Sequence, residues 1–331
     1  MEPLTVGVIG VGSLGQHHAR CYAELAGARL VGVVDVDKAR ATLVAARHGC
    51  QAMTDYRALI GQVDAVSVVA PTLLHHEIAT RCMEAGLHVL VEKPLAATME
   101  QARDLVAVAT SRGVTLQVGH IERFNPMVRA VQGVIQTPTL IECRRWAPFT
   151  SRGADVDVVL DVMIHDLDLV LGIVGAPWRD VQAQGLMMVS STTDVAQARV
   201  AFDNGCVATF SASRVAESKV RELRIYEPEG FVASDLVGHT AVVGRRVMGA
   251  SGKHEVVTKQ VVGDGREPLK LELEAFLNAI HTGTPPLVSG QEGVAALELA
   301  DAVMAEIAHH GRKESAGRKE SNGATDSHYH G

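Results

Sequence analysis

Three glycines with the spacing of a dinucleotide-binding loop stand near the start of the chain, as Gly10, Gly12 and Gly15. They follow a run of β-branched residues and precede a helical stretch, which is the context in which this spacing binds a pyrophosphate. The first glycine permits a tight turn, the second lets the phosphate approach, and the third lets helix pack on strand. The helix then offers its free N–H groups to the anion. We expect Ser13 and Leu14, inside the loop, to line the same cofactor.

Asp35 lies about 20 residues beyond the last of these glycines, at the end of the second predicted strand. A carboxylate at this point can accept the ribose hydroxyls of adenosine. Because it would repel a 2′-phosphate, the sequence favours NAD over NADP, and Lys38 and Arg40 nearby weaken that preference. The alternative is an acidic side chain that is solvated at a strand end.

Polar residues and prolines also follow the later strands of the predicted parallel sheet. Ligands of such sheets bind outside the carboxyl ends of the strands. Pro71 and Thr72 follow one strand, Glu92 and Lys93 another. Lys93 comes directly after an apolar run, so we expect its amine in the cleft, where it can donate to the reacting oxygen. The alternative is a surface lysine beside a turn proline. His75 is expected at the edge of the cofactor rather than as a metal ligand.

A second group of ionisable residues comes later, in the segment DVVLDVMIHDLD at 157–168. Asp161 and His165 are four residues apart, so they share one face of a predicted helix whose other residues are strongly apolar. Imidazole titrates near neutrality and suits a general base for alcohol oxidation, with Asp161 orienting it or contacting the substrate. Two alternatives stay open: a structural hydrogen-bonded pair, and a metal site. Hydride transfer to nicotinamide needs no metal.

The elements that position these residues fall into two groups. In the first group, Val-rich strands alternate with helices, which is typical of a doubly wound parallel sheet. We expect these strands at 5–9, 29–34, 65–69, 87–91 and 115–118, and the helices at 13–26, 38–48, 73–85 and 99–112. In the second group, tight turns separate successive strands, which predicts a mostly antiparallel sheet with strands at 139–145, 181–190, 195–202, 206–214 and 220–226. A helix at 157–173 interrupts them, and helices at 269–281 and 291–309 follow.

We therefore expect an α/β protein with a Rossmann domain at 1–122 and a second α/β domain at 123–310, whose last helix packs back on the first. The polar, repetitive segment 311–331 is expected to be a disordered tail. A net charge of −7 argues against nucleic acid as a partner. No targeting segment or membrane span is evident, which favours the cytoplasm. Five widely spaced cysteines predict reduced thiols.

Taken together, these motifs resemble the Gfo/Idh/MocA oxidoreductase family over about residues 4–309. The resemblance rests on the glycine loop, Glu92-Lys93-Pro94, the segment GHIERFNP at 119–126, and Asp161 with His165. It implies an NAD-dependent dehydrogenase in which Lys93 and His165, from separate domains, meet at one carbinol with Asp161 beside them. It also implies association of subunits, as a dimer or tetramer, through the second sheet. Met163 departs from the glycine that many members carry at that position.

GHIERFNP and DVVLDVMIHDLDL look, more narrowly, like the branch that includes UDP-N-acetylglucosamine 3-dehydrogenases, which supply a 3-amino sugar for lipid A. Substrate contacts are then expected from His120, Arg123, Asn125, Trp146 and Arg152. Arginines near Trp146 could clamp a diphosphate, or they could be solvated residues of a strand. Other hypotheses are a dehydrogenase of free sugars or inositol, reduction of a non-sugar, and a non-catalytic dinucleotide-binding regulator.

Overall fold

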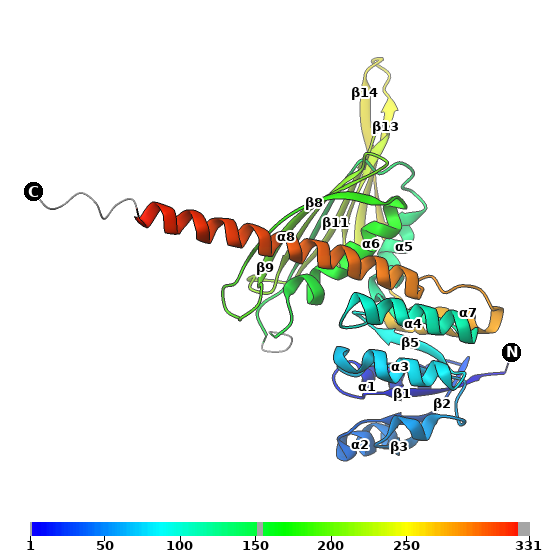
Figure 1. Ribbon diagram of the computed structural model, residues 1–331. Helices are drawn as coiled ribbons and strands as arrows, with labels where there is room; N and C mark the ends of the chain where they lie inside the picture. Colours follow the sequence, from blue (N-terminus) through cyan, green and yellow to red (C-terminus); the bar gives the residue numbers. More distant parts are fainter. Residues whose placement is uncertain (1, 151–154, 324–331) are drawn as a thin grey trace, which may run out of the picture. The chain divides into compact units, whose positions relative to one another are not determined.

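The computed structural model describes residues 2–150 and 155–323, with the side chains of 311–323 left out. It divides into two compact units (Figure 1). The first comprises residues 1–129 and 263–297, and the second comprises 130–262 and 298–331. The segment 263–297, which the sequence analysis assigned to the second domain, therefore belongs with the first unit. Among the described residues, no helix has the length and apolar character that a bilayer crossing needs.

The first unit is a doubly wound parallel sheet, as predicted. Its six strands follow the order β3-β2-β1-β4-β5-β6, and every neighbouring pair is parallel. The order of strands reverses between β1 and β4, so the loops after these strands diverge and leave a crevice for a ligand. The strands are β1 (Leu4–Ile9), β2 (Ala28–Val34), β3 (Gln51–Met53), β4 (Ala65–Val68), β5 (His88–Glu92) and β6 (Leu116–Gly119).

Helices cover this sheet in two groups, because α1 contacts both α2 and α7, whereas α3 contacts α4. The helix predicted at 269–281 is α7, and its place in the first unit was not predicted: Leu273 and Phe276 are completely buried in one core cluster with Tyr22 of α1. The helices are α1 (Gly15–Glu24), α2 (Lys38–His48), α3 (His75–Glu84), α4 (Met99–Arg112), α5 (Pro126–Gln132) and α7 (Pro268–Thr282), with short 3-10 turns η1 (Tyr56–Leu59), η2 (Thr72–Leu74) and η3 (Ile121–Phe124).

Capping residues explain where two of these helices begin and end. The side chain of Asp37 accepts from the backbone N–H of Ala39 at 3.0 Å and begins α2, and Thr98 begins α4 in the same way. Gly49 and Gly113, with φ of 65° and 66°, end the two helices in the left-handed region that favours glycine. These local signals keep both helices close to the predicted bounds of 38–48 and 99–112.

The second unit is an eight-stranded sheet with the order β14-β13-β12-β11-β7-β10-β9-β8, mostly antiparallel as predicted, with one parallel pair between β7 and β10. Its strands are β7 (Leu140–Trp146), β8 (Trp178–Leu186), β9 (Val195–Phe202), β10 (Val207–Ser213), β11 (Val220–Glu227), β12 (Gly230–Asp235), β13 (Thr240–Met248) and β14 (His254–Val262). The last three strands were not predicted.

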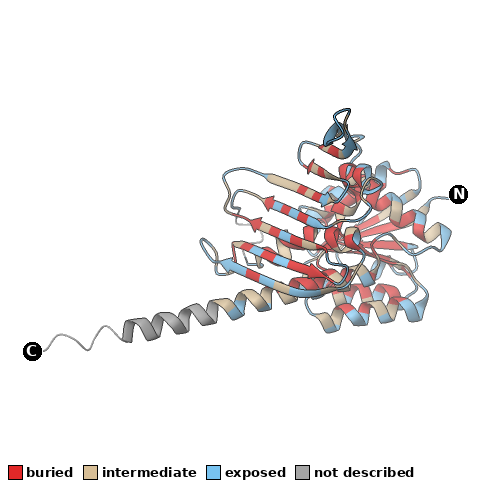
Figure 2. Ribbon diagram, turned by 90° about the horizontal axis from the view of Figure 1, so that it is seen from above, coloured by how far each residue is buried: buried red, intermediate tan, exposed pale blue. Residues whose placement is uncertain are grey.

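One face of this sheet is packed against a helical segment, and the other is lined by two pockets. Buried and exposed residues alternate along the strands, as Figure 2 shows, because successive side chains point to opposite faces. A π-helical turn η4 (Val159–Met163) continues into α6 (Ile164–Val174), and both pack on the central strands β7 and β10. On β7 the buried residues Ile141, Cys143 and Arg145 face this helix. The opposite face of the sheet is called the open face below.

The last helix, α8 (Gly290–Gly323), is longer than the predicted 291–309. Its first turns belong to the first unit, where a Cβ at Gly293 would lie 2.6 Å from Val118. The backbone is helical as far as Gly323, which includes part of the segment expected to be a disordered tail. Residues 324–331 of that segment lie outside the described residues.

Candidate active site

The glycine-rich loop between β1 and α1 has the backbone geometry that a pyrophosphate needs. Gly10 has a φ of 87°, in the region that favours glycine, and a Cβ there would lie 2.7 Å from the carbonyl oxygen of Val69. A Cβ at Gly15 would collide with the carbonyl oxygen of Gly10 at 1.8 Å, so the helix can approach the strand only without a side chain. At Gly12 no atom lies within 4 Å of the added Cβ. The middle glycine therefore faces open space, where a phosphate can approach the backbone.

Asp35 is held against this loop and is nearly buried, at 6% exposure. Its Oδ2 accepts from the backbone N–H of Val11 at 3.0 Å, and its Oδ1 accepts from that of Asp37 at 2.9 Å. The guanidinium of Arg40 lies 3.2 Å from the same carboxylate. A carboxylate offers about four acceptor positions, so these contacts leave room for a ribose hydroxyl. They also fix the orientation of the side chain before any nucleotide binds.

A cavity of about 410 Å³ adjoins the loop, between it and helix α2. Gly12, Ser13 and Gln16 line one side, and Arg40 and Arg47 line the other. Backbone N–H groups at the start of α1 and two guanidinium groups thus surround one space, which suits an anion. Of the five predicted cofactor residues in this loop, Gly12 and Ser13 line the cavity, whereas Gly10, Leu14 and Gly15 do not.

The end of β5 is organised by a buried pair that the sequence analysis missed. His18 of α1 is completely buried, and its Nε2 lies 3.0 Å from Oε1 of Glu92. The other carboxylate oxygen of Glu92 accepts from the backbone N–H of Lys93 at 3.2 Å. A Cβ at Gly119 would lie 2.9 Å from this carboxyl group, so the next strand leaves space for it only because it has glycine there. Glu92 therefore braces the backbone of Lys93.

Burial raises the pKa of Glu92, but the hydrogen bond from His18 and the charges of His18 and Lys93 outweigh burial and hold it below its usual value. The carboxylate is thus ionised and engaged with protein groups. The structure places the carboxylate of Glu92 among His18, Lys93 and Gly119, and its contact with the dinucleotide stays a prediction. A signal for this pair was present, because helix α1 begins at the same carboxyl edge of the sheet at which β5 ends.

His75 joins the loops that follow β4 and β5. Its Nε2 lies 2.8 Å from the carbonyl oxygen of Ala70, and its Nδ1 lies 2.9 Å from that of Pro94. Burial lowers the pKa of His75, and the two carbonyl groups oppose this. A neutral ring has one N–H and donates to one of the two oxygens. The imidazole therefore positions the peptide beside Lys93, and its predicted contact with the cofactor stays a prediction. Pro71 and Thr72 lie in the turn just before its helix.

Two of the predicted substrate residues that follow β6 are buried in the first unit. His120 is 1% exposed and Asn125 is 3% exposed. The side chain of Asn125 accepts from the backbone N–H of Met127 at 2.9 Å and donates to Glu122 at 3.1 Å, which ties it to the start of α5. Arg123 is half-buried in η3. The structure therefore uses Asn125 to shape the turn, and substrate contacts from this segment stay a prediction.

In the second unit, Asp161 and His165 lie on the segment that covers the central strands. Asp161 stands in the π-helical turn η4, and His165 stands in the first turn of α6, both half-buried. Wide turns of this kind occur frequently at functional sites. Below them, Asp166 is almost fully buried and lies 2.6 Å from Nη2 of Arg145 on β7. This ion pair fixes the helix that carries His165 to the sheet.

Two arginines of the basic stretch before this helix, Arg144 and Arg145, lie on opposite faces of the sheet, so these two do not clamp one diphosphate together. Arg145 is buried against Asp166, whereas Arg144 and Trp146 lie on the open face, away from α6. There the indole Nε1 of Trp146 donates to Ser211 at 3.0 Å, and the guanidinium of Arg144 stands 5.6 Å from the indole ring. The sheet therefore lies between Trp146 and the helix that carries His165, and the contact of Trp146 with the substrate stays a prediction. Arg152 lies outside the described residues.

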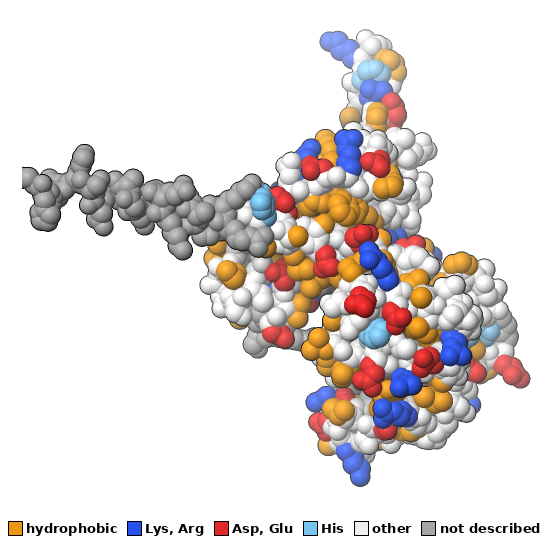
Figure 3. All heavy atoms as spheres, in the orientation of Figure 1, with side chains coloured by type: hydrophobic (Ala, Val, Ile, Leu, Met, Phe, Trp, Pro, Cys, Tyr) orange, Lys and Arg blue, Asp and Glu red, His pale blue; other side chains and the backbone are white. Residues whose placement is uncertain are grey.

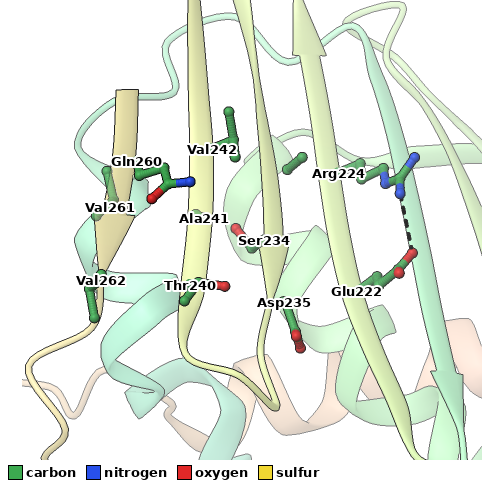
Figure 4. Close-up of a pocket in the computed structure, with 11 residues that line it drawn as sticks. Glu222, Arg224, Ser234, Asp235, Thr240, Ala241, Val242, Gln260, Val261 and Val262 are labelled. Carbon is green, nitrogen blue, oxygen red and sulfur yellow. Dashed lines mark ion pairs between the residues drawn. The ribbon is translucent and has the colours of Figure 1, made fainter. Parts of the chain in front are cut away.

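The open face has two pockets of its own. One of about 910 Å³ lies between β7, β8, β9 and β10 and the helix α8, and its lining includes Arg144, Trp146, Glu306 and His310. The other, of about 310 Å³, lies over β11 to β14, where Arg224 stands 3.6 Å from Glu222 (Figure 4). Neither contains a predicted catalytic residue. Within the described residues, no group of three or more His, Cys, Asp or Glu side chains has an arrangement that could hold a metal ion.

The glycine loop, its bound carboxylate and the lysine after β5 define the first unit as the nucleotide-binding domain of an NAD-dependent oxidoreductase. Comparison with known protein families agrees: residues 4–120 match the model described as "Oxidoreductase family, NAD-binding Rossmann fold", and residues 127–233 match the "GFO/IDH/MocA C-terminal domain". The chain belongs to the Gfo/Idh/MocA oxidoreductase family.

Individual relatives resemble the chain over nearly its whole length. UDP-N-acetylglucosamine 3-dehydrogenase of Acidithiobacillus ferrooxidans is 39% identical over 92% of this chain and 99% of its own. A solved structure of that enzyme has a TM-score of 0.87 and covers 93% of this chain and 98% of its own, at 37% identity. Inositol 2-dehydrogenase of Rhizobium meliloti is 28% identical over 91% of this chain and 96% of its own.

Proposed function

We propose that this protein oxidises a ring secondary hydroxyl of a nucleotide-linked amino sugar with NAD, at C3 of UDP-N-acetylglucosamine. The observation that supports this substrate is the 39% identity, over almost the full length of both chains, to an enzyme with that name. The product, a 3-keto sugar, would serve the 3-amino-sugar branch of lipid A synthesis. A cytoplasmic location is part of the same proposal.

Lys93 and His165 are the catalytic residues of this proposal, and Asp161 assists His165. Lys93 donates a hydrogen bond to the reacting oxygen from a backbone that Glu92 and His75 hold in place. His165 accepts the proton of the hydroxyl group. NAD supplies the hydride acceptor when bound. The open space at Gly12 and the orientation of Asp35 support its binding at the glycine loop.

Formation of NADH, followed by its absorbance, tests the substrate. We expect turnover with UDP-N-acetylglucosamine and none with free N-acetylglucosamine or myo-inositol. The second candidate, an inositol or free-sugar dehydrogenase, is favoured by the inositol 2-dehydrogenase of Rhizobium meliloti, which matches 96% of its own length. Oxidation of inositol without oxidation of the UDP-sugar would select that candidate. Binding of NAD with no turnover of any sugar would instead indicate a regulator.

The role of Lys93 has its own test. We expect Lys93→Met to lower kcat by about 100-fold or more, the range for loss of a general acid or base, with NAD affinity little changed. Lys253→Met removes a lysine from the turn between β13 and β14, in the second unit, and serves as the matched control. A Lys93→Met enzyme with the kcat of the control would exclude Lys93 from catalysis.

Subunit association is also proposed, as a dimer or tetramer through the second sheet. The open face supports this, because it carries apolar and paired charged side chains, and only Glu306 and His310 of α8 join the strands in lining its larger pocket. Size-exclusion chromatography with light scattering would measure the assembly. A monomer at every concentration up to about 100 μM would contradict it.

A further inference from the structure

Strand β14 forms one edge of the second sheet, and it is built as a pairing surface. It runs from His254 to Val262, and eight of its nine residues are exposed. Its register with β13 is continuous from Met248↔His254 to Thr240↔Val262, without a bulge. Among the described strands, only β13 pairs with it, so its outer row of backbone N–H and C=O groups faces outward. Long, regular edges of this kind are templates for pairing with another chain.

The hairpin formed by β13 and β14 also exposes apolar side chains. It extends beyond the neighbouring strands of its sheet, as Figure 1 shows, and carries charged, histidine and apolar side chains toward its end in Figure 3. Met248, Val256 and Val257 are 64%, 57% and 58% exposed. A two-stranded ribbon in water is only marginally stable, and further strands give it support. The exposed valines are therefore expected to be covered in the assembled protein.

The order of residues along β14 points to the partner. Glu255 and Lys259 stand at equal distances on either side of Val257, and all three point to one face of the strand. In antiparallel pairing about a two-fold axis at Val257, Glu255 of each copy lies opposite Lys259 of the other. On the other face, Val256 of each copy lies opposite Thr258. We propose that β14 pairs with β14 of a second copy of this chain in this register, which joins two sheets edge to edge.

Other registers fit less well. A two-fold axis between edge strands of one continuous sheet stands perpendicular to it, so residues directly opposite must share a face and the axis must pass through a residue. An axis at Val256 would place Lys253 of each copy opposite Lys259, two like charges. An axis at Thr258 would place Val257 opposite Lys259 and leave Glu255 without a cation. Only the axis at Val257 among these three matches opposite charges and pairs valine with valine.

This symmetry favours a second copy over an unrelated protein. A strand that binds a foreign partner has no need for opposite charges in mirror positions about one residue, whereas in an isologous interface that arrangement makes the strand complementary to itself. Glu255 and Lys259 form no ion pair within the described part of the chain, so both are available. Association through the open face, proposed above, uses a different surface. The two interfaces together would close at four subunits if their two-fold axes intersect at a right angle, and the edge pairing stands independently of the substrate.

Cysteine cross-linking tests the register. Directly opposite residues in antiparallel strands have Cα atoms about 4.5–5.5 Å apart, within disulfide range. Val257→Cys is therefore expected to give a disulfide-linked dimer under mild oxidation. Thr258→Cys is the matched control, because its two copies would lie on a diagonal about 7–8 Å apart, beyond that range. The native cysteines, which are buried or half-buried, set the background in the unmodified protein. Equal cross-linking of both variants, or none at Val257→Cys, would overturn the proposal.

A charge exchange tests the same register without cysteine. Glu255→Lys, and separately Lys259→Glu, should weaken the dimer by about 10- to 100-fold, because each creates two pairs of like charges. The double variant exchanges the charges and should restore association to near the native level. Asp180→Lys, on the exposed edge strand β8, makes the same change of charge at the other edge. A double variant as weak as either single one, or a Glu255→Lys dimer as stable as that of Asp180→Lys, would also overturn the proposal. Sedimentation velocity measures all of these.

Discussion

Removal of His18 is expected to destabilise the protein by an amount that depends on pH. His18 is completely buried and Glu92 is 8% exposed, so the carboxylate of Glu92 has little water to replace its partner. Loss of one member of a buried pair costs about 3–5 kcal/mol. We therefore expect His18→Ala to lower the free energy of unfolding by about 3–5 kcal/mol near neutral pH.

The pH dependence follows from the pKa of Glu92. In the native protein this pKa lies below 4.5, so its stabilising contribution is present above that value and is lost as pH falls through the folded-state pKa. Without His18, burial is the largest influence left, and burial raises the pKa of Glu92. Above that pKa, the buried and unpaired carboxylate of Glu92 lowers the free energy of unfolding of the variant. This loss disappears as the carboxyl group is protonated. The difference between the two proteins should shrink toward a packing cost of about 2 kcal/mol at low pH.

Urea unfolding followed by circular dichroism, between about pH 7.5 and about pH 4.5, measures this difference. His17→Ala is the matched control, because His17 is the exposed neighbour on the same helix. His18→Gln keeps an N–H donor and should recover part of the stability. A destabilisation by His18→Ala that is the same at both ends of this range would refute the argument, because it would show that the charge of Glu92 is not involved.

Three other predictions use the same kinds of measurement. Gly12→Ala should change the free energy of unfolding by less than about 0.5 kcal/mol and weaken NAD binding. Gly15→Ala should lower the free energy of unfolding by about 1–3 kcal/mol or more, because its side chain would collide with the backbone of Gly10. Equal effects of the two variants on stability would contradict this. Asp194 is fully buried and accepts three backbone N–H groups and a serine hydroxyl, and these hydrogen bonds outweigh burial and lower its pKa. Asp194→Asn should therefore lower the free energy of unfolding by about 1.5–3 kcal/mol at neutral pH and by less below pH 4, as measured by urea unfolding. Arg145→Met should lower the free energy of unfolding by about 3–5 kcal/mol, and the double variant Arg145→Met with Asp166→Leu should lower it by less. Additive losses in this double-mutant cycle would refute the pairing.

The parallel sheet was predictable because its strands are buried on both faces and read as continuous apolar runs. Asp37 and Thr98 are likewise residue types that favour the first position of a helix, and they mark the starts of α2 and α4. The segment that follows Glu227 gave no such signal. Strand β14 is exposed on both faces, so its apolar and polar residues do not alternate, and neither period nor burial marks it as a strand. Its structure depends on pairing with β13, a contact that a local pattern does not contain.

The candidate site was predictable to the extent that it depends on strand ends. Gly10, Gly15, Asp35 and Lys93 occupy the positions expected from the order of strand, turn and helix. The His18 contact depends instead on two segments far apart in the chain. Sequence spacing within one element says nothing about such pairs, although the topology of a Rossmann domain does, since helix starts and strand ends share one edge.

Successive side chains of a strand point to opposite faces of its sheet, and in β7 this alternation decides which residues can act together. Arg144, Arg145 and Trp146 are adjacent in sequence and look like one basic, aromatic surface. In the sheet they separate, with Arg145 turned toward α6 to neutralise Asp166 and the other two turned toward the open face. A diphosphate beside His165 would therefore need cations from elements other than this strand. The positive charge of β7 instead serves to hold the helix that carries His165, and to line the surface through which subunits are proposed to associate.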